Sequence, residues 1–230
     1  MKNSILYIIP CRKGSKRIPN KNFKSFGESS LSEISVKTLL QAKVEPKQII
    51  LSSDSTEASD IAKKYSILFQ QRSDQFSSDT TSTSETIFDL LSKNRLLKEF
   101  SYLSIIQPTS PLRTSEDIIK SRNMILENSF NSLISITECG FSRPEYLYYV
   151  KKNNLYKFSK DSIGIRSQDM PTYFYRNGSI YITKINYFLT TQSLIDNQSL
   201  CYYIMPFKRS INIDTYEDWE LAELLYREHV

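Results

Sequence analysis

The residues best able to do chemistry form a short basic stretch near the N-terminus. Five cations surround the Gly14-Ser15 pair there, namely Arg12, Lys13, Lys16, Arg17 and Lys21. Cationic side chains and the backbone N–H groups of a tight turn can share the oxygens of a polyanion such as a nucleoside triphosphate. The alternative is a solvated basic turn. The stretch is neither a Walker A sequence nor a G-x-G-x-x-G fingerprint, so we expect any nucleotide to be bound in another way.

A second candidate site lies near the C-terminus, at Asn212 and Asp214. Alternation predicts that both side chains lie on one face of a strand, ahead of a helix capped by Thr215 and Asp218. Two oxygen donors suit one Mg²⁺ (or Mn²⁺) shared with substrate phosphates. The only histidine is His229, which argues against Ser-His-Asp, Cys-His and HExxH chemistry.

Positioning these groups requires an alternation of strands and helices. Residues 5–9 are an unbroken apolar run ended by Pro10, which predicts a buried strand of a parallel sheet. Open α/β sheets bind ligands beyond the carboxyl ends of such strands. Further strands are predicted at 48–52, 66–69, 102–107, 133–137 and 179–183, with helices between them. The pattern predicts a three-layer α/β fold with a mainly parallel sheet.

Three loops after predicted strands carry polar residues. We expect Asp54, three residues before Glu57, to be a helix N-cap rather than a metal ligand. The hydroxyl-rich residues 70–84 are either a plain linker or a loop that meets a phosphate at the start of the next helix, whose apolar face is Ile87, Leu90, Leu91 and Leu97. Residues 107–113 read Gln-Pro-Thr-Ser-Pro-Leu-Arg, and their prolines fix an extended exit from the central strand. We expect Arg113 to form an ion pair at the start of the following helix, which Thr114 and Asp117 cap.

Residues 139–175 differ from the rest of the chain in being rich in Tyr and Phe. A polar turn at 151–154 separates two short apolar runs, which predicts an exposed hairpin. An aromatic hairpin that protrudes from an α/β core is a candidate partner surface.

Composition sets the remaining bounds. The chain has 230 residues, 40% hydrophobic content and a net charge of +5, which suits one domain spanning 1–230. The cysteines Cys11, Cys139 and Cys201 are too widely spaced for a disulfide framework or a zinc site. Neither a signal peptide nor a membrane-spanning segment is evident. We therefore expect a cytoplasmic protein with no membrane partner, and no nucleic acid partner because the basic residues concentrate in one loop.

Several of these motifs resemble those of the CMP-sialic acid synthetases, the acylneuraminate cytidylyltransferases, which include the CMP-legionaminic acid synthetases. Residues 9–16 and 18–22 are similar to the family's first loop, and residues 107–113 are identical to its heptapeptide. Residues 166–171 and 175–182 are similar to two later family segments. The chain departs from the family at Cys11 (usually Ala), at Lys13 (usually Gly) and at Asn212, which replaces the first Asp of Asp-Ile-Asp-Thr.

The resemblance implies a Rossmann-like nucleotidyltransferase fold and the transfer of CMP from CTP to the anomeric hydroxyl of a nine-carbon 2-keto acid sugar of sialic or legionaminic type, with release of pyrophosphate. It implies that residues 139–175 form the interface of a homodimer. The implied CTP-binding residues are Arg12, Ser15, Lys16, Lys21, Asn22, Arg72 and Ser82. The implied catalytic residues are Arg12, Lys16, Lys21 and Asp214, with Asp214 and Asn212 as metal ligands. The implied sugar-binding residues are Gln107, Arg166, Gln168, Asn177 and Tyr181, where a guanidinium can pair with the sugar carboxylate.

Other functions remain open at this point. Asn212 supplies no charge, so the chain can be a CTP-binding homologue with weak or no turnover. The sugar can instead be another acidic one, such as Kdo or pseudaminic acid. A basic nucleic-acid-binding module would show steeply salt-dependent affinity for oligonucleotides and no preference for CTP.

Overall fold

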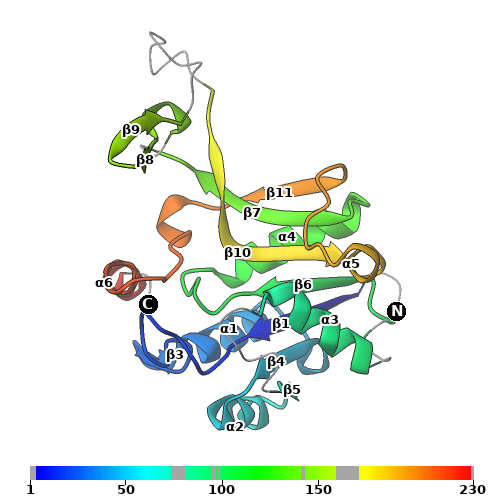
Figure 1. Ribbon diagram of the computed structural model, residues 1–230. Helices are drawn as coiled ribbons and strands as arrows, with labels where there is room; N and C mark the ends of the chain where they lie inside the picture. The colour runs from blue at the N-terminus through cyan, green and yellow to red at the C-terminus, as the bar shows by residue number, and fades with distance from the viewer. Residues whose placement is uncertain are drawn as a thin grey trace.

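The computed structural model describes residues 4–73, 81–94, 97, 99–140, 143–158 and 171–228. Its centre is a seven-stranded sheet of order β11-β7-β10-β6-β1-β4-β5 (Figure 1). Only β10 runs antiparallel to its neighbours in this sheet, so the mainly parallel arrangement is confirmed. The strands are β1 (Ile5–Pro10), β4 (Ile49–Ser53), β5 (Leu68–Gln71), β6 (Tyr102–Ile106), β7 (Ser132–Glu138), β10 (Phe174–Lys184) and β11 (Leu200–Ile204).

Helices cover both faces of the sheet and form the two outer layers. They are α1 (Leu31–Gln41), α2 (Thr56–Lys64), α3 (Thr83–Lys93), α4 (Ser115–Glu127), α5 (Ile185–Thr191) and α6 (Tyr216–Arg227). Alternate residues of β1 point to opposite sides because strand side chains have a period of two. Tyr7 and Ile9 pack in one buried cluster with residues of α1, α2 and α4, whereas Leu6 and Ile8 pack in another with residues of α3 and α5. The predicted three-layer fold is confirmed.

A third apolar cluster anchors the basic loop to the C-terminal helix. It joins Ile18, at the end of the loop, to Ile213 and to Trp219 of α6. Phe26, in the small ribbon of β2 (Ser25–Phe26) and β3 (Ser29–Ser30), meets Trp219 edge to face with ring centroids 5.2 Å apart. This packing holds the first loop and the start of α6 at fixed positions relative to each other.

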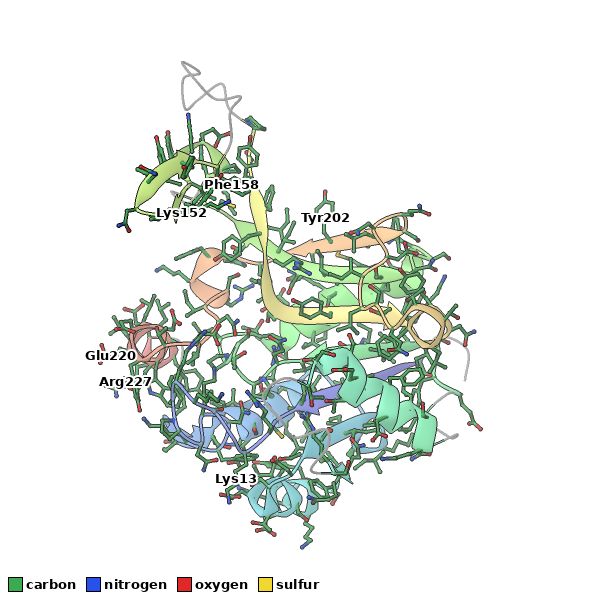
Figure 2. The ribbon with its side chains drawn as sticks, viewed as in Figure 1. Lys13, Lys152, Phe158, Tyr202, Glu220 and Arg227 are labelled. Atoms are coloured by element: carbon green, nitrogen blue, oxygen red, sulfur yellow. The ribbon has the colours of Figure 1, made fainter. Side chains whose placement is uncertain are left out.

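The predicted aromatic hairpin is confirmed as β8 (Tyr148–Lys151) and β9 (Asn154–Lys157). It projects from the body of the molecule, as the positions of Lys152 and Phe158 show in Figure 2. The rings of Tyr149 and Tyr156 stack across the hairpin with centroids 5.4 Å apart. Within the described ranges, no helix combines the length and apolar content needed to span a membrane.

Some local expectations were wrong. Helix α2 has Ser55 as its N-cap, not Asp54, whose Oδ1 instead accepts a hydrogen bond of 2.7 Å from the backbone N–H of Lys13. Helix α3 ends at Lys93, so Leu97 is buried beyond the helix and not on its face. Strand β10 begins five residues before the predicted 179, and β11 was not predicted at all.

Candidate active site

A cavity of about 430 Å³ lies at the carboxyl ends of β1, β5 and β6. The basic loop after β1 supplies Arg12, Ser15 and Lys21 to its wall, and the segment before α6 supplies Asn212 and Asp214. An adjoining cavity of about 460 Å³ is lined by Lys16, Arg17 and Lys21 among others. The structure thus brings the two candidate sites of the sequence together at one edge of the sheet, where an α/β fold binds its ligands.

Lys21 connects these two loops directly. Its Nζ donates a hydrogen bond of 2.5 Å to the carbonyl of Ile213 and lies 3.3 Å from Oδ1 of Asp214. Arg17 approaches the other oxygen of Asp214 at 3.8 Å. The carboxylate of Asp214 remains half exposed and lines both cavities.

Asn22 holds the basic loop in shape. Its Nδ2 donates a hydrogen bond of 2.9 Å to the carbonyl of Arg12, and its own carbonyl accepts from the N–H of Ser32. The side chain is buried although it borders the main cavity. These contacts give Asn22 a structural part in positioning Arg12, and its expected contact with CTP stays a prediction.

Arg72 is a buried cation in the wall of the main cavity. Its Nε donates a hydrogen bond of 3.0 Å to Oγ of Ser52, while its NH2 group has no hydrogen-bond partner within the part of the chain that the structure describes. Burial lowers the pKa of the guanidinium from its usual value, as expected where water is excluded. A buried donor without a partner at a cavity wall is consistent with the expected nucleotide contact.

The N-terminus of α3 also reaches the main cavity, but not through Ser82. Ser82 is the N-cap of α3, and its Oγ accepts from the N–H of Glu85 at 3.2 Å and donates to the Glu85 carboxylate at 2.8 Å. Its hydroxyl is thereby committed to a capping box. The lining residues are its neighbours Thr81, Thr83 and Thr86, which the sequence indicated only as part of a hydroxyl-rich run.

Gln107 stands where the main cavity meets two others. One, of about 570 Å³, is lined by residues of β10 and by Phe207 and Leu221. The other, of about 440 Å³, lies between β10 and residues 192–195. Gln107 lines all three, and Tyr181 and Arg176 line the latter two. Gln107 therefore lies between a basic cavity and a mixed polar and aromatic one.

Asn177 borders the second cavity but its side chain is engaged within the protein. It is only 2% exposed, its Nδ2 donates to Oγ of Ser210 at 2.9 Å, and its Oδ1 accepts from Oγ of Ser135 at 2.6 Å. These bonds fix the irregular turn in β10 at Gly178, which has a φ of +76°. These contacts give Asn177 a supporting role at the turn, and because it also borders the second cavity, its expected contact with the sugar stays a prediction. Its neighbour Arg176 is the exposed cation that sequence reasoning missed.

Arg113 does not form the expected ion pair. It is almost completely buried, and its NH1 group donates to the carbonyl of Ser179 at 2.7 Å. Burial lowers its pKa to about 10. The ion pair at the start of α4 is instead between Asp117 and Arg209, 2.8 Å apart. Arg113 therefore connects the segment that leaves β6, which contains Gln107, to Ser179 of β10.

Residues 211–214 are not a strand, contrary to prediction. They are extended, with Ile211 and Ile213 buried and Ile213 N–H bonded to the carbonyl of Thr109 at 2.7 Å. Asn212 and Asp214 face the cavities because alternate residues of an extended chain point to opposite sides.

A bound Mg²⁺ prefers oxygen ligands and keeps several of its own waters. Among the described residues, no group of three or more acidic, His or Cys side chains could hold a metal. The half-exposed carboxylate of Asp214 can serve as one ligand beside a triphosphate. The Oδ1 of Asn212 is enclosed and has no hydrogen-bond partner among the described residues, and its expected part as a second ligand stays a prediction. Arg166 and Gln168 lie outside the described residues.

The chain is similar to proteins that are named as cytidylyltransferases. A family model described as cytidylyltransferase matches residues 6–226. The chain is 31% identical to the CMP-N,N'-diacetyllegionaminic acid synthase of Legionella pneumophila, over 96% of this chain and 95% of that protein. It is 28% identical to a pseudaminic acid cytidylyltransferase of Campylobacter jejuni, over 99% and 97% of the two chains.

Two other similar proteins share less sequence or less of their length. An N-acylneuraminate cytidylyltransferase of Escherichia coli is 28% identical over 96% of this chain and 52% of that protein. The structure of a CMP:2-keto-3-deoxy-manno-octonic acid synthetase complexed with CTP superposes with a TM-score of 0.73, covering 99% of this chain and 100% of that one, at 12% identity. That structural match supports the fold alone.

Proposed function

Because the chain belongs to the cytidylyltransferase family, we propose that it transfers CMP from CTP to the anomeric hydroxyl of a nine-carbon 2-keto acid sugar of sialic or legionaminic type, releasing pyrophosphate. The observation that carries this proposal is the position of Gln107. It joins a cavity walled by cations to one walled by Arg176 and Tyr181. Such a junction suits a reaction between a triphosphate and an anionic sugar.

The nucleotide half of the site would use the cations of the first loop. Arg12, Lys16 and Lys21 would hold the triphosphate, together with Ser15 and the buried guanidinium of Arg72. These charges would also stabilise the pyrophosphate as it leaves, because fixed cations favour the side on which negative charge develops. The hydroxyls at the start of α3 would contact the nucleotide at the N-terminus of that helix, where N–H groups attract anions.

The sugar half would use the cavities along β10. The exposed guanidinium of Arg176 can pair with the carboxylate of a 2-keto acid sugar. Tyr181 and Gln107 offer a hydroxyl and an amide for sugar hydroxyls. Arg166 and Gln168 remain proposed contacts to the sugar from the family resemblance.

In the reaction, the anomeric oxygen forms a bond to the α-phosphorus while the bond from that phosphorus to the β-phosphate oxygen breaks. The proton of the hydroxyl passes to solvent, and pyrophosphate leaves with the electron pair of the broken P–O bond. Holding both substrates at Gln107 supplies proximity and alignment. Mg²⁺ or Mn²⁺, held by Asp214 and the triphosphate, would neutralise phosphate charge.

The exposed hairpin would serve as the interface of a homodimer. Val150 is 70% exposed and Leu155 and Phe158 are each 66% exposed, which is unusual for apolar side chains grouped on one projection. Replacement of Val150 and Leu155 together with Asp should convert a dimer to a monomer in light scattering at micromolar concentration. A wild-type protein that is already monomeric there would exclude this interface.

The reaction itself is tested by pyrophosphate release from CTP and Mg²⁺ with a panel of acidic sugars. The panel contains N-acetylneuraminic, diacetyllegionaminic, pseudaminic and 3-deoxy-manno-octulosonic acids. Release with CTP and a sialic or legionaminic acid is the expected result. Release only with pseudaminic acid would favour the second candidate, which the match to the Campylobacter enzyme over 99% of the chain supports. CTP binding without release from any sugar would favour a homologue that lacks turnover.

A further inference from the structure

Asn212 occupies an unusual position between the two cavities. Of the residues that the structure describes, only Asn212 and Gln107 line both the cation-rich cavity and the cavity of about 570 Å³ along β10. If CTP fills the first and the sugar fills the second, as proposed above, the α-phosphate must lie where they meet. The bond to the sugar forms at that phosphorus, so no other part of the nucleotide can occupy the junction.

The amide of Asn212 presents its nitrogen, not its oxygen, to this junction. The Oδ1 is enclosed, whereas the residue as a whole lines both cavities. Near the turn in β10, Nδ2 of Asn212 and Oε1 of Gln107 both lie within 4 Å of the point where a Cβ on Gly178 would stand. In this orientation the amide nitrogen of Asn212, and not a second acceptor oxygen, lies on the Gly178 side together with Oε1 of Gln107.

The backbone keeps Asn212 in this position. Buried Ile211 and Ile213 flank it, and the N–H of Ile213 is bonded to the carbonyl of Thr109. The next residue is held as well, because the N–H of Asp214 donates to the Asp218 carboxylate at 2.9 Å. Because the backbone is held on both sides of Asn212, its amide nitrogen can stay at the junction before any ligand binds, as a preorganised site requires.

We propose that Asn212 donates a hydrogen bond from its amide nitrogen to the α-phosphate of CTP, and that it is not a metal ligand. A carboxylate at this position would repel the phosphate unless a metal lay between them. A neutral amide donor contacts the phosphate oxygen directly. The metal is then held at one protein carboxylate, Asp214, and by the phosphates. This inference rests on the proposed function, because it assumes that CTP occupies the first cavity.

The test compares binding of CTP and CMP, measured calorimetrically in EDTA. Asn212→Ala is expected to weaken both nucleotides by about tenfold, because the α-phosphate is common to them. Asn212→Asp, which has nearly the same shape, should weaken both further through repulsion. Lys16→Ala is the contrasting variant and should weaken CTP much more than CMP. Asn128→Ala, at the exposed end of α4, is the control and should change neither.

A second measurement follows Mn²⁺ binding to the CTP-saturated protein by electron paramagnetic resonance. Asn212→Ala should leave the Mn²⁺ affinity within about twofold of the wild type, whereas Asp214→Ala should lower it at least tenfold. Three outcomes would overturn the inference: unchanged affinity for CMP in Asn212→Ala, an effect on CTP without an effect on CMP, or a tenfold loss of Mn²⁺ affinity in Asn212→Ala. A wild-type protein that binds no CTP would instead reject the proposed function itself.

Discussion

The Nζ of Lys21 lies 3.3 Å from Oδ1 of Asp214, although the two residues are 193 positions apart in the chain. This contact closes the basic loop after β1 against the segment before α6. The Lys21 side chain is only 12% exposed, whereas that of Asp214 is 55% exposed, so the pair presents its carboxylate side to solvent. The ammonium group also lines the main cavity, where it can meet a phosphate without leaving Asp214.

Replacement of Lys21, Lys16 or Asp214 with Ala should lower kcat/KM for pyrophosphate release by at least about 100-fold, because the two lysines balance phosphate charge and Asp214 is the proposed ligand of the metal ion. Circular dichroism should show an unchanged fold. Replacement of exposed Lys93 on α3 with Ala is the control, since it should leave the rate unchanged. A Lys21→Ala variant with wild-type turnover would remove this loop from the proposed site.

Ser82 and Thr83 should separate stability from nucleotide binding. Ser82→Ala removes the N-cap of α3 and should lower the free energy of unfolding by about 1 kcal/mol, with CTP affinity unchanged. Thr83→Val keeps the shape but removes a hydroxyl that lines the cavity, so it should weaken CTP severalfold with little effect on stability. Urea denaturation and calorimetry measure the two quantities. The reverse pattern would mean that Ser82 contacts the nucleotide.

Gly178→Ala should weaken binding of the sugar, because the added methyl group would displace the side chain of Gln107. The residue has a φ of +76°, and a Cβ there would lie 3.2 Å from Oε1 of Gln107. The backbone strain should cost about 1–2 kcal/mol of stability. Gly140→Ala is a matched control, because Gly140 also has a positive φ but its Cβ would have no neighbour within 4 Å. Both variants should lose stability, and only Gly178→Ala should also raise the KM for the sugar.

Asp117 should make stability depend on pH. Burial alone would raise its pKa, but hydrogen bonds from Arg209 and Thr114 outweigh burial and hold the pKa below its usual value. A lowered pKa means that this carboxylate stabilises the fold above pH about 4 and that the contribution is lost as the pH falls further. Asp117→Asn should cost about 3 kcal/mol at pH 7 and less near pH 3. Equal losses at both values, in urea titrations, would contradict this account.

Arg176 should determine the affinity for the sugar and not for the nucleotide. Arg176→Gln removes the guanidinium that lines both cavities along β10, so the KM for the acidic sugar should rise about 10-fold to 100-fold. The KM for CTP should change less than twofold. Arg227→Gln, at the exposed end of α6, is the matched control for charge and should change neither constant. A rise confined to CTP would place Arg176 in the nucleotide half.

The sequence by itself determined the elements and several of their ends. Apolar periodicity located most strands and helices, and the capping boxes Thr114–Asp117 and Thr215–Asp218 are present as predicted. These features are readable because they arise from contacts between residues only a few positions apart. The sequence also located the basic loop, since an α/β sheet binds ligands beyond its strand ends. It identified the polar residues of 212–214 as well, although that segment is not the strand that was predicted.

The tertiary structure alone decided what each polar side chain contacts. Arg113 bonds to Ser179, 66 residues away, instead of a near carboxylate, and Asn177, at the border of the second cavity, bonds to Ser210, 33 residues away. Ser82 and Arg176 also could not be assigned from the sequence. Ser82 caps α3 while its neighbours Thr81 and Thr83 line the cavity, and Arg176 is exposed while its neighbour Asn177 is buried. A buried polar group must find a hydrogen-bond partner, and the available partner depends on which distant segments pack against it.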